Sequence, residues 1–194
     1  MARRQSPDVS WHEGRVARKD RGSRGATIWF TGLPSSGKST IAAAVEERLV
    51  SAGRPAYRLD GDNLRHGLSG DLGFSAEDRA ENVRRAGEVA ALLADAGVVA
   101  LVSLVSPFAA DRERARRAHD VAGLPFAEVY VSTPPAECER RDPKGLWARA
   151  RVGQITGFTG VDDPYEPPSD PELTLGPELS VEAAAEEVLR WIPR

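Results

Sequence analysis

One stretch of the chain decides its fold: Gly32-Leu33-Pro34-Ser35-Ser36-Gly37-Lys38-Ser39-Thr40. An apolar, strand-like run at 26–31 leads into it, and a helical pattern begins at its end. The glycines of this stretch allow backbone N–H groups to turn inward toward a bound anion. A glycine-rich loop that joins a strand to a helix in this way predicts an α/β fold with a phosphate-binding loop (P-loop).

The chemistry of the P-loop, residues Gly32–Thr40, suits a nucleoside triphosphate. The helix N-terminus that follows supplies unpaired N–H donors and the positive end of its dipole. In such loops the lysine, here Lys38, reaches the β- and γ-phosphates, and the serine hydroxyl, here Ser39, binds Mg²⁺. A Gly- and Ser-rich loop can fit the pattern by chance, but the flanking strand and helix argue against chance. We therefore predict that the whole loop binds the nucleotide and that Ser39 is the metal ligand.

The composition is that of one α/β domain. The chain has 194 residues, and no apolar run reaches the length of a membrane span. We expect a cytoplasmic protein, because no signal-peptide pattern opens the chain and Cys138 is its only cysteine. The histidines are scattered and predict no metal cluster. A net charge of −3 argues against a general nucleic-acid partner.

Positive charge is concentrated at the beginning of the chain. Residues 1–25 include Arg3, Arg4, Arg15, Arg18, Lys19, Arg21 and Arg24 and have little apolar content. We interpret 1–25 as a basic N-terminal arm, mobile or peripherally packed, and 26–194 as a P-loop domain. A functional role for the arm is the alternative to a solvated tail.

Strand-like and helix-like segments alternate, which predicts a short parallel sheet with helices on both faces, a three-layer fold. The strands are expected at 26–31, 55–59, 98–105 and 126–132. The helices are expected at 38–51, 77–96, 109–121 and 181–192. Two segments, 60–76 and 144–176, lack apolar periodicity, and loops of such length are usually functional or disordered.

Carboxylates follow the second expected strand in the segment Asp60-Gly61-Asp62-Asn63-Leu64-Arg65. Ligands of open parallel sheets bind at the carboxyl ends of the strands, so this segment should face the P-loop. A carboxylate there can orient or deprotonate an attacking hydroxyl. A plain Asp-Gly turn is the alternative, and spacing alone does not decide between them. The third strand has no terminal aspartate, so Mg²⁺ would depend on Ser39, the phosphates, water and these aspartates.

Two further segments carry charge in a suggestive pattern. Arg79, Asn82 and Arg85 lie three residues apart on an expected helix, where they can grip an anionic substrate or pair with acidic surface neighbours. The basic segment 140–151 leads into Gly157-Phe158-Thr159-Gly160. We predict a lid at about 144–160, whose closure brings positive charge to a transferring phosphoryl group and excludes water. A disordered basic loop is the alternative.

Together these motifs resemble the adenylylsulfate (APS) kinase family of P-loop kinases. The resemblance extends from about residue 11 to 192. It rests on the segments 27–40, 59–68, 72–85, 106–108, 141–146 and 157–160. The P-loop alone is shared with many unrelated enzymes, whereas Asp-Gly-Asp-Asn-Leu-Arg together with Gly-Phe-Thr-Gly is much more specific.

The resemblance implies a reaction. ATP donates its γ-phosphoryl group to the 3′-hydroxyl of adenylyl sulfate, which gives ADP and 3′-phosphoadenylyl sulfate (PAPS) in sulfate assimilation. It also implies Mg²⁺ and commonly a homodimer. A separately encoded ATP sulfurylase is an expected partner.

The resemblance assigns roles to individual residues. Asp62 would hold or deprotonate the 3′-hydroxyl, and Lys144 on the lid would lie near the transferred group. The remaining assignments are Arg65, Arg79 and Asn82 on the phosphosulfate and sugar, Phe74 and Phe158 around the adenine, and Arg141 on the ATP base. Family descriptions make Ser106 a phosphorylated intermediate. Because in-line transfer needs no covalent step, we expect Ser106 to be a substrate contact.

Two other functions stay open. A P-loop kinase for another small hydroxyl acceptor has no need of the two phenylalanines. A non-catalytic regulatory domain that binds nucleotide has little use for an intact Lys38 and Ser39.

Overall fold

The structure, a computed structural model, describes residues 10, 12 and 14–193. Within these residues lies one parallel five-stranded sheet with the strand order β2-β3-β1-β4-β5. The strands are β1 (Ala26–Thr31), β2 (Ala56–Asp60), β3 (Val99–Ser103), β4 (Phe126–Val131) and β5 (Leu173–Leu175). The predicted parallel sheet is confirmed. Its edge strand β5 was missed, because three residues give no readable period.

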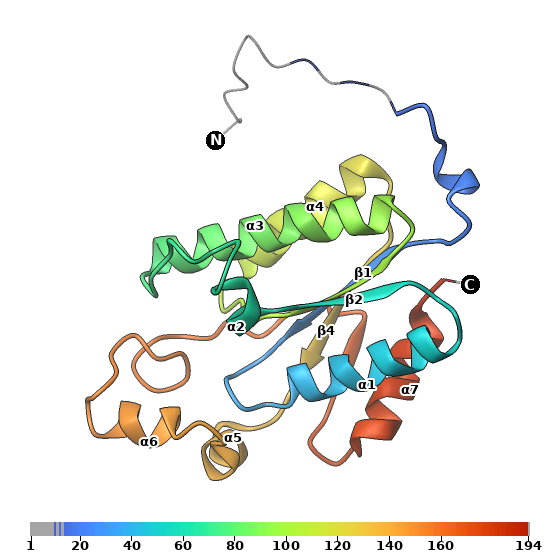
Figure 1. Ribbon diagram of the computed structural model, residues 1–194. Helices are drawn as coiled ribbons and strands as arrows, with labels where there is room; N and C mark the ends of the chain where they lie inside the picture. Colours follow the sequence, from blue (N-terminus) through green and yellow to red (C-terminus); the bar gives the residue numbers. More distant parts are fainter. Residues whose placement is uncertain (1–9, 11, 13, 194) are drawn as a thin grey trace.

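Helices cover both faces of the sheet, as predicted (Figure 1). Four long helices are α1 (Lys38–Ser51), α3 (Ala76–Asp95), α4 (Ala109–Ala122) and α7 (Val181–Trp191). Figure 1 shows α3 and α4 on one face and α1 and α7 on the other. Three short helices, α2 (Gly61–Leu64), α5 (Pro135–Arg141) and α6 (Leu146–Arg151), were not predicted. Each is too short to show a helical period.

The ends of the long helices follow their capping residues. The Ser75 hydroxyl accepts a hydrogen bond from the Asp78 N–H, so α3 begins at Ala76, one residue before the prediction. The Ser180 hydroxyl caps α7 in the same way. Gly123 ends α4 with φ 62°, a left-handed conformation that glycine adopts at little cost.

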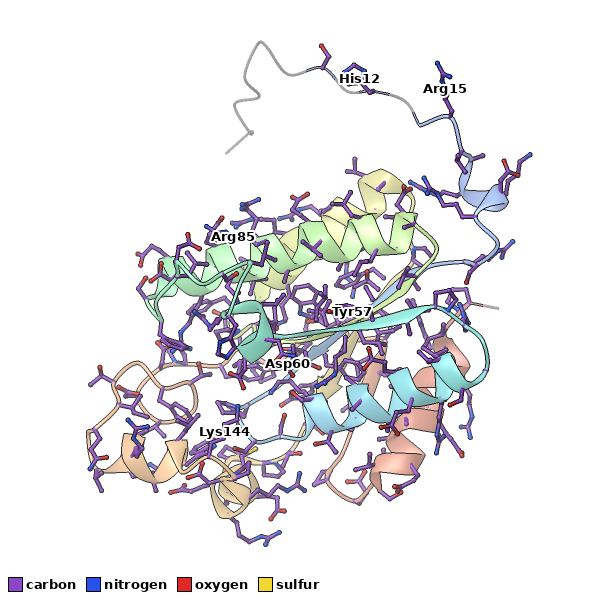
Figure 2. The ribbon with its side chains drawn as sticks, viewed as in Figure 1. His12, Arg15, Tyr57, Asp60, Arg85 and Lys144 are labelled. Carbon is purple, nitrogen blue, oxygen red and sulfur yellow. The ribbon has the colours of Figure 1, made fainter. Side chains whose placement is uncertain are left out.

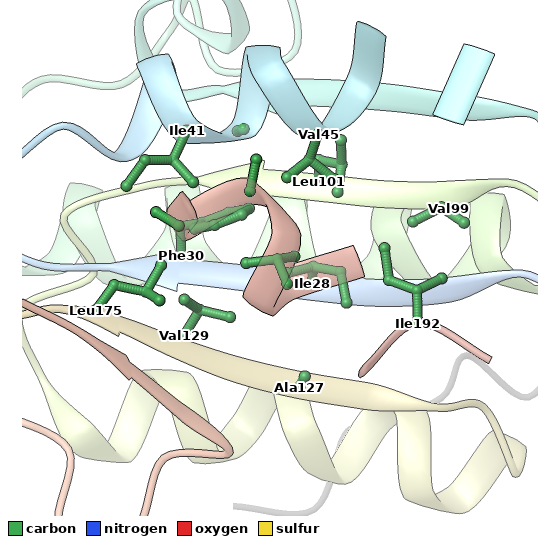
Figure 3. Close-up of a cluster of buried hydrophobic side chains, with 14 of the residues drawn as sticks. Ile28, Phe30, Ile41, Val45, Val99, Leu101, Ala127, Val129, Leu175 and Ile192 are labelled. Atoms are coloured by element: carbon green, nitrogen blue, oxygen red, sulfur yellow. The ribbon is translucent and has the colours of Figure 1, made fainter. Parts of the chain in front are cut away.

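The core is built on the two faces of β1, all six of whose residues are buried. Ile28 and Phe30 point toward α1 and α7, where they pack with Ile41 and Val45 (Figure 3). The alternate residue Trp29 packs on the opposite face, against the alanines of α3. A strand that is apolar on both sides therefore occupies the sheet interior, as its continuous apolar run requires.

The carboxyl ends of β1, β2 and β3 meet at one edge of the sheet. The register pairs Phe30 with Ser103, and Ser103 with Asp60. The strand predicted over 98–105 ends at Ser103, and Leu104 and Val105 leave the sheet there. This early exit places the segment Leu104–Phe108 over the edge that also carries the P-loop.

The described part of the N-terminal arm packs on the far ends of α3 and α4. Its 3₁₀ helix, Arg18–Asp20, brings the Arg18 guanidinium to Asp95 at 2.5 Å and to the Gly123 carbonyl at 3.3 Å. Arg3 and Arg4 lie outside the described residues. Among those that are described, none of the helices combines the length and apolarity needed to cross a membrane.

His119 makes the fold sensitive to acid. Its buried Nδ1 donates to the Ala115 carbonyl, and its Nε2 accepts from the Thr27 hydroxyl, both at 2.8 Å. Burial lowers the pKa of His119 below its usual 6.5. The unfolded chain therefore binds more protons below pH 6.5, and the free energy of unfolding falls as the pH falls through that range. We expect His119→Gln to lose about 1–3 kcal/mol at pH 7 and to show a flatter pH dependence.

Urea unfolding between pH 7 and pH 5 checks this expectation. His66→Gln is the matched control, because His66 is exposed. Equal slopes of stability against pH in wild type and His119→Gln would contradict it.

Candidate active site

A cleft of about 630 Å³ opens at the carboxyl ends of the strands. Its walls come from the P-loop, the segment after β2, the segment after β3, α3, and the lid segment between α5 and residue 160. All eight predicted acceptor-side residues line it: Asp62, Arg65, Phe74, Arg79, Asn82, Ser106, Lys144 and Phe158. Segments far apart in the sequence therefore form one continuous site.

The predicted nucleotide-binding residues divide into two groups. Those that line the cleft are Pro34, Ser35, Gly37, Lys38, Ser39, Thr40 and Arg141. Gly32, Leu33 and Ser36 instead lie behind it as supports. A Cβ on Gly32 would lie 2.6 Å from the Val131 carbonyl oxygen, so only glycine fits there. Leu33 packs against Trp147 and Phe158 of the lid segment.

Lys38 is buried at the bottom of the P-loop. Its Nζ donates to the carbonyls of Gly32 and Leu33, at 3.0 and 2.7 Å, and to the Ser36 hydroxyl. Burial lowers the pKa of Lys38 to about 8, although the charges of Cys138, Asp60 and Asp62 act in the opposite direction. A phosphate group at this position would restore a strongly favoured positive charge.

Oxygen atoms surround the predicted metal ligand. The Ser39 hydroxyl donates to Asp60 Oδ2 at 2.6 Å, and Asp60 Oδ1 caps α2 by accepting from the Asp62 N–H. Ser103 lies beside Asp60 in the sheet, and its buried hydroxyl has no hydrogen-bond partner. Sequence reasoning missed Ser103, although a polar residue that closes an apolar run was a readable signal. In the described chain, no group of three or more His, Cys, Asp or Glu side chains could hold a metal.

Asp62 and Lys144 form an ion pair across the mouth of the cleft. Figure 2 shows Lys144 on the segment between α5 and α6, and Asp60 at the end of β2 close by. The two paired side chains are 66% and 60% exposed, so solvent screens their attraction. The pair is therefore easily exchanged for contacts with a charged ligand.

Two aromatic rings line the acceptor side. The Phe74 ring is 67% exposed, and the Arg65 guanidinium lies 4.2 Å from its centroid. Phe158 is buried and meets Trp147 edge to face, with ring centroids 5.4 Å apart. A planar base can reach both rings from the cleft, and stacking on them stays a prediction.

Arg79 and Asn82 present different chemistry from one face of α3. Arg79 donates to the Gly157 carbonyl and the Thr159 hydroxyl, and it lies 3.4 Å from Asp163. Arg79 thus ties α3 to the lid segment. The Asn82 side-chain oxygen is buried without a hydrogen-bond partner in the cleft wall. An unmet acceptor at this position suits a ligand that donates a hydrogen bond.

Arg85 does not join this face, and for it the surface ion-pair alternative is correct. Its guanidinium bonds Asp71 at 2.6 Å and Glu81 at 2.9 Å, outside the cleft lining (Figure 2). The reason is helical geometry. Each step of three residues falls about 60° short of a full turn, so Arg85 lies about 120° around the helix from Arg79.

The lid segment is folded onto the P-loop, which contradicts the disordered alternative. The Trp147 indole N–H donates to the Pro34 carbonyl at 3.2 Å. Asp162 accepts from the N–H groups of Gly157 and Phe158, each at 2.7 Å. Arg141, at the end of α5, donates to the Ser36 carbonyl at 3.3 Å beside the nucleotide half of the cleft.

Comparisons with known proteins agree with this geometry. A family model described as Adenylylsulphate kinase matches residues 24–176. The bifunctional enzyme CysN/CysC of Mycobacterium tuberculosis is 54% identical over 97% of this chain, which spans 31% of that relative. The adenylyl-sulfate kinase of Staphylococcus epidermidis is 46% identical over 97% of this chain and 96% of its own length.

A solved structure gives the same relationship in space. The M. tuberculosis APS kinase CysC, in complex with AMPPNP and APS, superposes with a TM-score of 0.85. It is 56% identical, and the superposition covers 87% of this chain and 97% of that one. With the family model, the full-length relative and the fold all in agreement, this chain belongs to the adenylylsulfate kinase family of P-loop kinases.

Proposed function

We propose that the protein transfers the γ-phosphoryl group of ATP to the 3′-hydroxyl of adenylyl sulfate, which gives ADP and PAPS in sulfate assimilation. One observation carries the proposal: an intact P-loop and the predicted acceptor-side residues line a single cleft. Membership of the family supports the same reaction. The predicted site residues divide this cleft into a nucleotide half and an acceptor half.

In the nucleotide half, the P-loop amides and the N-terminus of α1 bind the phosphates of ATP. Lys38 exchanges its loop carbonyls for the β- and γ-phosphates and neutralises their charge. Arg141 lies beside the loop, where its guanidinium packs on the ATP base.

The donors around Ser39 fit Mg²⁺. They are hard oxygen atoms, and the single hydroxyl ligand leaves the remaining positions to phosphates and water, as Mg²⁺ prefers. When bound, Mg²⁺ bridges the β- and γ-phosphates and offsets the charge that develops during transfer. Asp60 holds the Ser39 hydroxyl in place for this ligation.

In the acceptor half, Asp62 orients the 3′-hydroxyl and accepts its proton as the phosphoryl group arrives. Lys144 releases Asp62 and supplies positive charge to the transferring group, which the weak, exposed ion pair allows. Arg65, Arg79 and Asn82 bind the phosphosulfate and the sugar, and Phe74 and Phe158 stack on the adenine.

The transfer is direct, and Ser106 is a substrate contact. Its hydroxyl accepts a hydrogen bond from the Trp29 indole N–H at 3.1 Å and donates to the Leu104 carbonyl. Neither partner is a base that could activate the hydroxyl as a nucleophile. In-line transfer between bound substrates requires only positioning and neutralisation of charge.

A homodimer and a separate ATP sulfurylase partner are also proposed. A bifunctional relative that extends far beyond the matched segment supports a second enzyme working beside this one. A cytoplasmic location is proposed on the single, buried cysteine, which a reducing compartment suits.

A comparison of acceptors tests the proposal. The purified protein is given Mg²⁺-ATP with adenylyl sulfate, AMP or simple sugars in parallel, and ADP release is followed. Rapid ADP release with adenylyl sulfate alone is the expected result. Equal turnover with a sugar would favour a kinase for another acceptor. Tight PAPS binding without turnover would favour a regulatory domain.

A further inference from the structure

We propose that Arg112 is a positioning residue for the acceptor half of the cleft. Its guanidinium holds the Ser106 segment and the trailing end of the lid in one arrangement. The inference rests on the proposed function, because that function assigns Ser106 and the lid to the acceptor.

The Ser106 segment needs to be held. Among the described residues, Ser35 and Ser106 are the non-glycine residues with positive φ, and Ser106 has φ 40°. Such a backbone persists only where its surroundings over-determine it. Ser106 is also buried in the wall of the cleft, so its conformation shapes the surface that the acceptor meets.

Arg112 is buried and bonds three separate segments. Its Nη1 donates to the Ser106 carbonyl at 2.7 Å, and its Nη2 donates to the Glu166 carbonyl at 2.7 Å. Its Nε donates to Glu128 on β4 at 2.5 Å. A planar guanidinium fork can satisfy three directions at once, which a lysine ammonium on a flexible stem does not reproduce.

The segment just after the lid is fastened to the same place. The Glu166 N–H donates to the Pro107 carbonyl at 2.9 Å, and the Glu166 carboxylate accepts from the Ala109 N–H at 2.7 Å. The Tyr165 hydroxyl lies 3.0 Å from that of Thr31. Thr31 in turn donates to the Val105 carbonyl. The trailing end of the lid and the Ser106 segment are therefore one unit, and Arg112 bonds both halves of it.

Loss of the fork is expected to act on one substrate. Arg112 makes no hydrogen bond to the P-loop, so the nucleotide half should keep its geometry. We expect Arg112→Lys to lower kcat/KM for adenylyl sulfate by about 10- to 100-fold, through a raised KM and a lowered kcat. The KM for ATP should change by less than about twofold.

Arg116→Lys is the matched control. Arg116 also pairs with Glu128, at 3.8 Å, and with Glu172, at 2.6 Å, and it has no bond to the Ser106 segment. It should leave both KM values near those of wild type. Thermal unfolding and the affinity for a fluorescent ATP analogue report whether each variant is folded. If Arg112→Lys does not fold, Tyr165→Phe removes one hydroxyl from the same unit and should still raise the KM for adenylyl sulfate selectively.

The outcomes separate the two proposals. A wild-type protein that releases no ADP with adenylyl sulfate overturns the proposed function. A wild-type protein that turns over, with an Arg112→Lys variant that raises both KM values equally or behaves like Arg116→Lys, overturns the positioning role alone.

Discussion

Lys38→Met is expected to lower kcat/KM with adenylyl sulfate by about 10³-fold or more. Methionine keeps much of the length and apolar stem of the side chain but removes the charge that neutralises the β- and γ-phosphates. The fold should survive, because the variant also removes a buried ammonium whose pKa burial already lowers to about 8. Steady-state ADP release measures the effect. Lys19→Met in the exposed arm is the matched control.

The affinity for ATP gives a second measure of Lys38. A bound triphosphate raises the pKa of Lys38 from about 8, so ATP binding takes up a proton above pH 8. The affinity of wild type should therefore fall as the pH rises above about 8, and Lys38→Met should lose this dependence. Near wild-type turnover in Lys38→Met would contradict the assigned role.

Asp62→Asn is expected to lower kcat by about 10²- to 10⁴-fold, with a smaller effect on the KM for ATP. The amide keeps the shape of the side chain but cannot accept the proton of the 3′-hydroxyl. Asp62 lies at the mouth of the cleft, and its backbone N–H, which caps α2, is unchanged by the substitution. Single-turnover kinetics at saturating ATP separate the chemical step from binding.

The ion pair with Lys144 provides the control for Asp62. If Asp62 acts only as a partner of Lys144, then Lys144→Met should cost as much as Asp62→Asn, and the double variant should cost no more than either. If Asp62 is the base, the double variant should be slower than both single variants. Asp71→Asn, outside the cleft, should leave kcat unchanged.

The long elements of the fold could be predicted from the sequence. Strand β1, helix α1 and the P-loop between them lie where the pattern placed them, because strong period and glycine signals act locally. The elements that were missed are short. Strand β5 and helices α5 and α6 depend on neighbours distant in sequence: β5 pairs with β4, and the Trp147 ring of α6 packs on Leu33 and Phe158.

The candidate site divides in the same way. Arg79, Asn82 and Arg85 read alike in the sequence, but only the folded helix shows that Arg85 turns to Asp71 and Glu81. Arg112 and Ser103 gave no prediction. Their meaning comes from an unpaired hydroxyl and from a fork of hydrogen bonds, both of which exist only after distant segments meet.

The sequence by itself determined the fold class, the nucleotide loop and the family, because residue type and spacing in Gly32–Thr40 and Asp60–Arg65 carry that chemistry locally. The tertiary structure decided which charged residues face the cleft, which pair at the surface, and how Arg112 joins the lid to the Ser106 segment. Those outcomes depend on the angle around a helix and on contacts between strands, and neither is written in the spacing of residues along the chain.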